Sequence, residues 1–427
     1  MTTVRYESAI GTTAGAIPVN TEVAIHTRAS DGASVQDVFI DNQPAIQFDA
    51  GGRQRMSQIT TLFDGKNLGF FHSLLWDVAG TGTGAFANNK YNMSVTAGQW
   101  YLLQSHRYFP YFSGKDQIIE ETFDGFGLEA GVAKRFGYFS SNAVSPFDTT
   151  YDGLWIENDG TTYYIKTSRA GTETTSVAFS DWDNYALLAD YNFNNFTVFF
   201  IDFLWLGGAV MRVWVKTNAG FVLAHTVNYA GSAQDVFMLS PNQPARYEIR
   251  STTGSGSFRY ICSQVGTEGS IEESGTSRAV DIGNTAVTFG TIGTTYPVKA
   301  IRKAAAYRDI GVLLEDIEIF ITSTGDKLRW SLQINPTLSA PLTYTAVANS
   351  AAEEASGNGI ITVTVSGTII ARGGVQSGQL LPNHILDKNF LAWLGGTPAN
   401  VMDQYVLCVT PMTTACTLTG GIAYKEL

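Results

Sequence analysis

The sequence predicts an all-β protein, and two observations carry that prediction. First, apolar and polar residues alternate with a period of two in many short stretches. In 201–225, for example, Val213 and Val215 alternate with Trp214, and an Asn-Ala-Gly turn at 218–220 precedes a second apolar strand. Second, the 43 glycines suit many short strands joined by tight turns. A long aromatic hairpin of this kind is typical of the centre of a β-sandwich, here jelly-roll or lectin-like.

The length of 427 residues favours two domains over one. Residues 1–45 are polar and weakly periodic, which predicts an extended N-terminal arm. Residues 46–269 are expected to form the β-sandwich and 270–427 a second, smaller β domain, because 263–277 is rich in Gly, Ser and Glu and is typical of a linker. Candidate strands cover residues 93–96, 100–107, 154–157, 163–167, 197–204, 210–216, 221–225, 245–249, 316–321, 328–334, 360–365, 368–371 and 405–410.

Two stretches complete this expectation. Residues 157–161 contain Asp-Gly and predict the clearest hairpin turn. Residues 300–315 carry helical propensity through three consecutive alanines, but their β surroundings favour a strand.

Composition narrows the classes of function. A formal net charge of −11 argues against nucleic-acid binding, since phosphate contacts need clustered Lys and Arg. The sequence opens with no basic-then-apolar signal segment, and no apolar stretch is long enough to span a bilayer. We therefore expect a soluble chain made in a cytoplasm, with no disulfide between Cys408 and Cys416.

The sequence offers little for catalysis. The five histidines are dispersed, and no Gly-x-Ser-x-Gly or close His/Cys metal spacing occurs. We predict no enzyme activity, no cofactor and no metal. A glycosidase would need two carboxylates facing one cleft. The acids available for such a pair are Glu120, Glu121 and Asp124, or Glu157 and Asp159, and we expect them to be solvated surface acids.

Three groups of residues are candidates for an interface or a ligand surface. Aromatic side chains edged with Asn and Asp can hold a glycan, although aromatics and Arg are also enriched at interfaces and in cores. A loop with two acids could also hold Ca²⁺, but the Asp-x-Asp-x-Asp-Gly pattern is missing. The candidates are Arg107, Tyr108, Tyr111 and Phe112; Asp181, Trp182 and Asp183; and the basic pair Arg53 and Arg55.

Several segments resemble a family of tailed-bacteriophage virion structural proteins, and their order along the chain is more specific than any one of them. Gly52 departs from the family, which usually has a bulky residue there, and residues 1–45 lie outside the resemblance. The matching segments are DAGGRQR at 49–55, TTLFD at 60–64, RYF at 107–109, SGK at 113–115, KRFGYF at 134–139, IDFLWLG at 201–207, PNQPARYEI at 241–249, RW at 329–330, NPTL at 335–338 and AYKEL at 423–427.

The resemblance implies a subunit of the virion, on the outside of the particle as a tail, tail-fibre or capsid-decorating protein that acts through assembly contacts. Its partners would be other virion proteins and further copies of the same chain, with a homotrimer favoured by analogy. Two alternatives stay open. One is a lectin-like module that binds host surface glycans for attachment, and the other is a glycan depolymerase.

Overall fold

The computed structural model describes residues 25–28, 35–38, 50, 58–141, 147, 152–205, 210–229, 235–271, 275–283, 285–378 and 392–427. Most of the expected N-terminal arm lies outside these residues. Within it, β1 (Ile25–Arg28) and β2 (Val35–Val38) pair antiparallel.

The first domain is a β-sandwich of two antiparallel sheets, as the sequence predicts. One sheet has the order β12 (Thr172–Ala178), β11 (Tyr163–Arg169), β10 (Asp152–Asn158), β9 (Val132–Ser140), β16 (Ala245–Ser251), β7 (Trp100–Ser105) and β4 (Trp76–Gly80). The other has the order β15 (Gly220–Asn228), β14 (Val210–Thr217), β13 (Thr197–Phe203), β8 (Gln117–Asp124), β17 (Gly256–Glu268), β6 (Lys90–Val95) and β5 (Thr83–Ala87), with β3 (Ile59–Asp64) also paired to β17.

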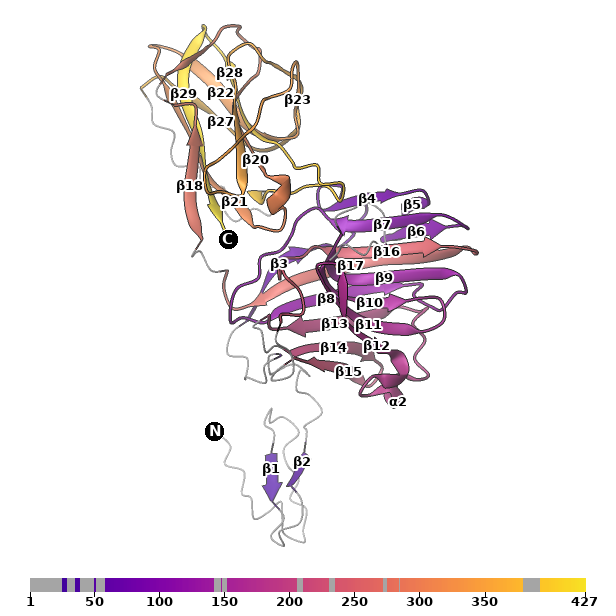
Figure 1. Ribbon diagram of the computed structural model, residues 1–427. Helices are drawn as coiled ribbons and strands as arrows, with labels where there is room; N and C mark the ends of the chain where they lie inside the picture. The colour runs from indigo at the N-terminus through magenta and orange to yellow at the C-terminus, as the bar shows by residue number, and fades with distance from the viewer. Residues whose placement is uncertain are drawn as a thin grey trace.

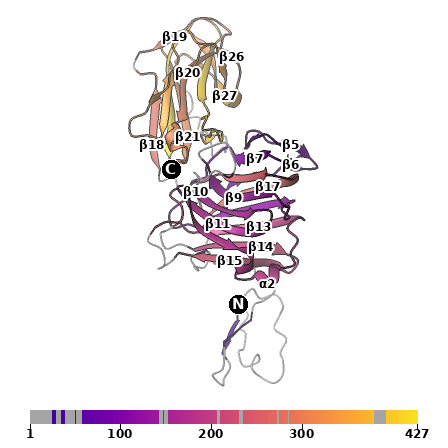
Figure 2. The ribbon, with the colours of Figure 1, turned by 45° about the vertical axis from the view of Figure 1, so that its right-hand side comes forward.

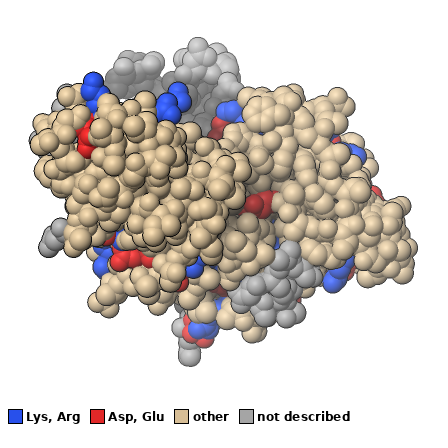
Figure 3. Space-filling view, turned by 90° about the horizontal axis from the view of Figure 1, so that it is seen from above, with Lys and Arg blue, Asp and Glu red and all other residues tan. Residues whose placement is uncertain are grey.

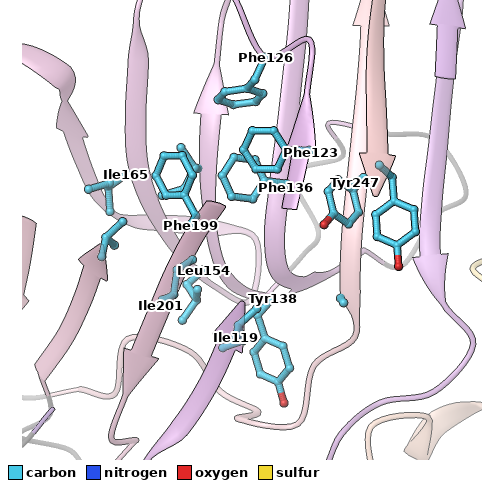
Figure 4. Close-up of a cluster of buried hydrophobic side chains, with 14 of the residues drawn as sticks. Ile119, Phe123, Phe126, Phe136, Tyr138, Leu154, Ile165, Phe199, Ile201 and Tyr247 are labelled. Carbon is cyan, nitrogen blue, oxygen red and sulfur yellow. The ribbon is translucent and has the colours of Figure 1, made fainter. Parts of the chain in front are cut away.

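Aromatic side chains from both sheets fill the space between them (Figure 4). Phe136 of β9 lies at the centre, with its ring centroid 4.3 Å from that of Phe123 and 5.0 Å from that of Phe199 on the facing sheet. All three are fully buried. Such ring contacts stabilise the packing of the two sheets beyond what the burial of apolar surface contributes.

The second domain also packs two sheets against each other around its own core, which runs from Val280 to Tyr424. The four-stranded sheet consists of β18 (Thr276–Asp281), β29 (Cys416–Glu426), β19 (Val287–Phe289) and β21 (Val312–Ile321). The six-stranded sheet has the order β24 (Thr345–Ala346), β25 (Ala352–Ser356), β20 (Tyr296–Lys303), β28 (Tyr405–Pro411), β22 (Lys327–Ile334) and β27 (Thr368–Gln376). A two-stranded ribbon of β23 (Thr337–Leu338) and β26 (Val363–Val365) completes the domain.

Helix is sparse among the described residues. It comprises η1 (Phe179–Asp181), α2 (Tyr185–Leu188) and η2 (Ala305–Tyr307). The stretch 300–315 is mainly strand, in β20 and β21, with η2 between them. Cys262, Cys408 and Cys416 are free thiols.

The linker expected at 263–277 was predicted to begin too early, because its first residues belong to a strand. Strand β17 runs on to Glu268, paired with β3 on one side and β8 on the other. Ser263 and Val265 are buried there, so the Ser and Gly content of this segment belongs to a central strand. Only the residues after Glu268 connect the two cores.

Figures 1 and 2 show the C-terminal domain at the end of the sandwich where β4 to β7 lie, away from β15 and α2. The connection between β7 and β8 therefore faces the second domain.

We expect Phe136→Ala to lower the free energy of unfolding by about 3–5 kcal/mol, because it leaves a cavity among packed aromatic rings. Urea denaturation of the purified variant measures this. Phe196→Ala is the matched control, since Phe196 is 64% exposed and its loss should change stability by about 0.5 kcal/mol or less. Equal effects of the two substitutions would contradict the proposed core.

Candidate functional site

The aromatic run at 106–112 follows β7 and lies at the junction of the two domains. Arg107 is 2% exposed. Its Nε donates to the carbonyl oxygen of Trp393 at 2.8 Å, and its Nη2 donates to the hydroxyl of Tyr405 at 3.3 Å, both in the C-terminal domain. Its Nη1 donates to the carbonyl oxygen of Leu74 in the sandwich at 3.1 Å. Arg107 is therefore an interface residue, but the interface is internal to the chain.

His106 bridges the same two domains through two carboxylates. Its Nδ1 lies 2.5 Å from Asp77 of the sandwich, and its Nε2 bonds Asp403 of the C-terminal domain. Burial alone would lower the pKa of His106, but the two carboxylates raise it to about 9. Burial opposes the charge on Asp403 as well, yet the bond and charge of His106 hold its pKa below the usual value. The pair is thus charged at neutral pH.

Tyr108 also belongs to the junction rather than to the surface. Its ring lies beneath Lys303, whose Nζ is 5.5 Å from the ring centroid, and beneath Arg308 at 5.7 Å. Lys303 donates to the carbonyl oxygens of Arg308 and Ile310. Burial lowers the pKa of Lys303 to about 7.

The last two candidates of the run lie within the sandwich domain. The hydroxyl of Tyr111 accepts a hydrogen bond from the backbone N–H of Trp205 at 3.1 Å. Trp205 lies just beyond β13 and is half-buried, with its indole N–H donating to the carbonyl of Met238 at 2.8 Å. Phe112 is buried. Neither Tyr111 nor Phe112 forms the exposed platform that a glycan needs.

The second candidate group, residues 181–183, is only partly exposed. Trp182 is 3% exposed, because its ring packs edge-on against Phe179 at 4.9 Å and its indole N–H donates to Val177. Asp183 is exposed, but its carboxylate accepts from the backbone N–H of Thr226 at 2.8 Å and so holds a loop. Asp181 is exposed. The pair Arg53 and Arg55 lies outside the described residues.

Three of the acids that a depolymerase would use, Glu121, Asp124 and Glu157, are buried, contrary to the sequence-based expectation, whereas Glu120 and Asp159 are half-buried. Glu121 is fully buried between the sheets, where the hydroxyls of Tyr247 and Ser263 bond its carboxyl group. Burial raises the pKa of Glu121 to about 8, so the group is mostly neutral at pH 7. The residues that bond Glu121 come from strands distant in sequence, so the sequence around Glu121 does not predict its burial.

Glu157 lies on the outer face of its sheet in a buried network of ion pairs. Its carboxylate is 2.7 Å from the Nε of Arg135 and 3.3 Å from the Nζ of Lys166, and Arg135 also approaches Glu248 at 3.8 Å. Burial opposes the charge, but the cations hold the pKa of Glu157 below its usual value. A general acid of a glycosidase needs a raised pKa, so these contacts fit a structural network.

A cleft of about 510 Å³ opens beside the His106 bridge, between the two domains. Asn335 follows β22 in a left-handed conformation with φ of 51°. Its amide donates to Asp403 at 2.6 Å and its carbonyl oxygen accepts from the N–H of Gln404 at 2.8 Å. The cleft is lined by Ser73, Leu74, Asp77, His106, Arg107, Ile334, Asn335, Ser366, Gly367, Thr368, Thr397 and Asp403.

A second pocket, of about 640 Å³, adjoins this cleft on the outer face of the six-stranded sheet, and Ser366 lines both. Because they share this residue, we treat the two pockets together and call them the junction groove. The sequence-based reasoning missed it. The signal was present, since Arg329, Ser331 and Gln333 alternate with apolar residues and so share one face of a strand. The second pocket is lined by Thr295, Arg329, Trp330, Ser331, Gln333, Ser366, Ile369, Arg372, Gly373, Gly374 and Thr410.

Two further findings concern the described part of the chain only. It contains no group of three or more His, Cys, Asp or Glu side chains placed to hold a metal ion. None of the helices in that part is long and apolar enough to cross a membrane.

We expect the His106 bridge to stabilise the protein by about 3 kcal/mol below pH 6.5 and to lose this contribution as the pH rises through about 9. The sign follows because the pKa of His106 is raised by folding. Lys303 has a lowered pKa, so its effect on the pH dependence of stability has the opposite sign. Wild type and His106→Gln both contain Lys303, so this effect cancels when their stabilities are compared. Urea denaturation of the two at pH 6, 8 and 10 should give a stability difference that shrinks toward pH 10. A difference that does not change with pH would refute the charged bridge.

Comparisons with known proteins give a fold-level likeness. No protein-family model matches the sequence, and a search of curated proteins found no relative. Among solved structures, the carbohydrate recognition domain of Emp47p matches with a TM-score of 0.34 and 10% identity, over 50% of this chain and 98% of that one. The exoplasmic/lumenal domain of VIP36, solved with Ca²⁺ and Man3GlcNAc, matches with a TM-score of 0.35 and 14% identity, over 51% and 92%. A β-glucanase of Bacillus licheniformis matches with a TM-score of 0.30 and 13% identity, over 48% and 96%. Because these scores lie below 0.5 and include both binding domains and an enzyme, the function of this chain has to be argued from its own residues.

Proposed function

We propose that this protein is a non-enzymatic carbohydrate-binding module that holds a glycan of the host surface in the junction groove. The observation that supports this most directly is that two polar pockets share Ser366 as a lining residue. Residues from Arg329 to Asn335 run along the groove, and an extended strand of that length spans about 20 Å. A groove of this length suits several linked sugars better than a small metabolite.

The chemistry of the lining also fits a sugar. Hydroxyl groups of a saccharide both donate and accept hydrogen bonds, and the groove offers amide, hydroxyl, guanidinium and carboxylate groups. Ile369, which is 45% exposed, supplies apolar surface beside these polar groups. Binding sites of this class combine a few fixed polar groups with an apolar wall.

The acids of the groove do not suggest hydrolysis. Asp77 and Asp403 are both held by His106, and the pKa of Asp403 is kept low. A glycosidase needs one carboxyl group with a raised pKa to protonate the leaving oxygen. We therefore propose binding without cleavage.

Filling the groove should abolish this binding without unfolding the protein. Ser366 is exposed and lines both pockets, so Ser366→Trp places a large ring where a sugar would lie. A glycan array identifies the ligands of wild type, and titration calorimetry then compares the variant, for which we expect a loss of at least about tenfold in affinity. Ser277→Trp is the matched control, because Ser277 is exposed on β18, outside the groove. Unaltered binding by a folded Ser366→Trp variant would exclude the groove.

A second candidate function is that of a virion structural subunit, and an exposed apolar patch favours it. Leu187 and Phe196 are 67% and 64% exposed and line the same hollow near α2, together with Tyr191. Exposed apolar surface rimmed by polar residues is typical of a protein–protein contact. The two functions are compatible, since the patch lies near α2, at the end of the sandwich away from the junction groove (Figure 1).

If this patch mediates assembly, wild type should sediment as an oligomer, with a trimer favoured, and Leu187→Asp should sediment as a monomer. A buried charge in such a contact is unfavourable unless it is paired. Analytical ultracentrifugation at micromolar concentration measures both, and Ser277→Asp serves as a control for added charge. A monomeric wild type would count against self-assembly through this patch.

A further inference from the structure

Two arginines lie side by side on the outer face of the six-stranded sheet, in the part of the junction groove farthest from His106. Arg329 is on β22 opposite Gly374, and Arg372 is on β27 opposite Ser331. This register makes the two arginines diagonal neighbours on one face, with Cβ atoms about 7–8 Å apart. Both are exposed, and both line the same pocket.

The surroundings of this arginine pair lack a compensating charge. Arg107, Arg135 and Lys303 each have an acidic or carbonyl partner, whereas the described residues supply no ion pair to Arg329 or Arg372, and no Asp or Glu is among the residues lining their pocket. The contrast is marked because the whole chain carries a formal net charge of −11. Figure 3, which views the molecule from the side of the C-terminal domain, shows charged side chains few and scattered over that face. Two like charges held close together are unfavourable until an anion lies between them.

The neutral groups of the pocket add donors to this pair. Ser331 accepts a hydrogen bond from the side-chain amide of Gln333 at 2.8 Å, so its own hydroxyl hydrogen is left to donate. Gln333 is itself fixed, because its carbonyl oxygen accepts from the N–H of Gly367 at 3.0 Å. The hydroxyls of Thr295 and Thr410 bond each other at 2.9 Å, and whichever of them accepts keeps a hydrogen to donate. The pocket is therefore rich in donors.

One glycine keeps the space above this floor open, and its neighbour serves the core. Gly373 lies opposite the buried Trp330, where a Cβ would be 2.8 Å from the indole ring, so only glycine lets β27 approach the ring this closely on the inner face. A Cβ at Gly374 would meet only the carbonyl oxygen of Leu328, at 3.7 Å, which shows how little surrounds that position. The exposed side chain of Ile369 and two guanidinium groups therefore border one hollow.

We propose that this pocket binds the anionic group of an acidic sugar, with Arg329 and Arg372 sharing the oxyanion and Ile369 bordering the sugar ring. The inference rests on the proposed function, because the acidic sugar would be one unit of the glycan that lies in the junction groove. Arginine suits a carboxylate or a sulfate ester because its planar fork donates two parallel hydrogen bonds. The shared chemistry is an oxyanion on a saccharide, and the experiment separates its two sources.

The test changes the ligand first and the protein second. Titration calorimetry compares wild-type binding of an oligouronate, its carboxyl-reduced neutral form and a sulfated oligosaccharide of the same length. We expect the neutral form to bind at least about tenfold more weakly than one acidic form, the size of effect typical of a charged hydrogen bond. The preferred acidic form identifies the source as a carboxylate or a sulfate. This arm needs no variant, so it holds even if a substitution impairs folding.

The protein arm uses Arg329→Gln and Arg372→Gln, both exposed positions, with folding checked by circular dichroism. Each should remove the preference for the acidic form. Lys327→Gln is the control, because it removes one positive charge from the same strand outside the pocket lining and should leave the preference intact. Equal binding of acidic and neutral forms by wild type, or an unchanged preference in both arginine variants, would overturn this inference while glycan binding stands. If no oligosaccharide binds at all, the proposed function fails and this inference fails with it.

Discussion

The buried guanidinium of Arg107 is the constraint on which the two-domain structure depends. A charged group out of water is strongly unfavourable unless its donors are bonded. Arg107 satisfies that demand by donating to Leu74 in one domain and to Trp393 and Tyr405 in the other. Separating the domains would leave this charge without its C-terminal partners. Contacts between domains of one chain often allow relative motion, but this one resists it.

The junction groove follows from that fixed contact. In the cleft beside His106, one wall belongs to the sandwich and the other to the C-terminal domain, so the shape of this part of the groove exists only while the domains stay together. Gly395 lies so close to His106 that a Cβ there would be 2.6 Å from the imidazole ring, which lets the chain bring Asp403 within reach. Asn335 then fixes the other oxygen of Asp403. Groups held in place before a ligand arrives lose less conformational entropy on binding.

The sequence predicted the architecture because the architecture depends on local alternation. Strands β14 and β15 and the turn between them follow directly from the period of two and the Asn-Ala-Gly turn. The Asp-Gly hairpin at 157–161 is also present, with Asp159 accepting from the backbone N–H groups of Thr161 and Thr162. The end of β17 has the composition of a loop, yet it pairs with a strand on each side. It was not predicted as a strand, because its pairing depends on strands far away in sequence and local alternation does not reveal it.

The candidate site was harder to predict, because burial of polar groups is a tertiary property. The run at 106–112 was identified as an interface or ligand surface on its aromatic and Arg content, which both kinds of site share. Nothing local indicates that the partner is residues 393–405 of the same chain. Glu121 likewise looks like a surface acid until Tyr247 and Ser263 are brought beside it. The Arg329 and Arg372 pair depends on the register of β22 against β27, which the sequence alone does not fix.

The net charge of the chain determines the stage of binding at which the pair of Arg329 and Arg372 would contribute. A polyanionic glycan approaches a protein whose formal net charge is −11, so long-range electrostatics slows its encounter. At physiological salt that repulsion fades beyond about 8 Å, whereas two guanidinium groups in direct contact with an oxyanion are screened much less. Selectivity would then come from contacts made after the ligand is seated, and it would be expressed mainly in the dissociation rate. An acidic surface that carries a local basic pair in a groove therefore discriminates against polyanions in general, and favours a polyanion whose charge lies beside that pair.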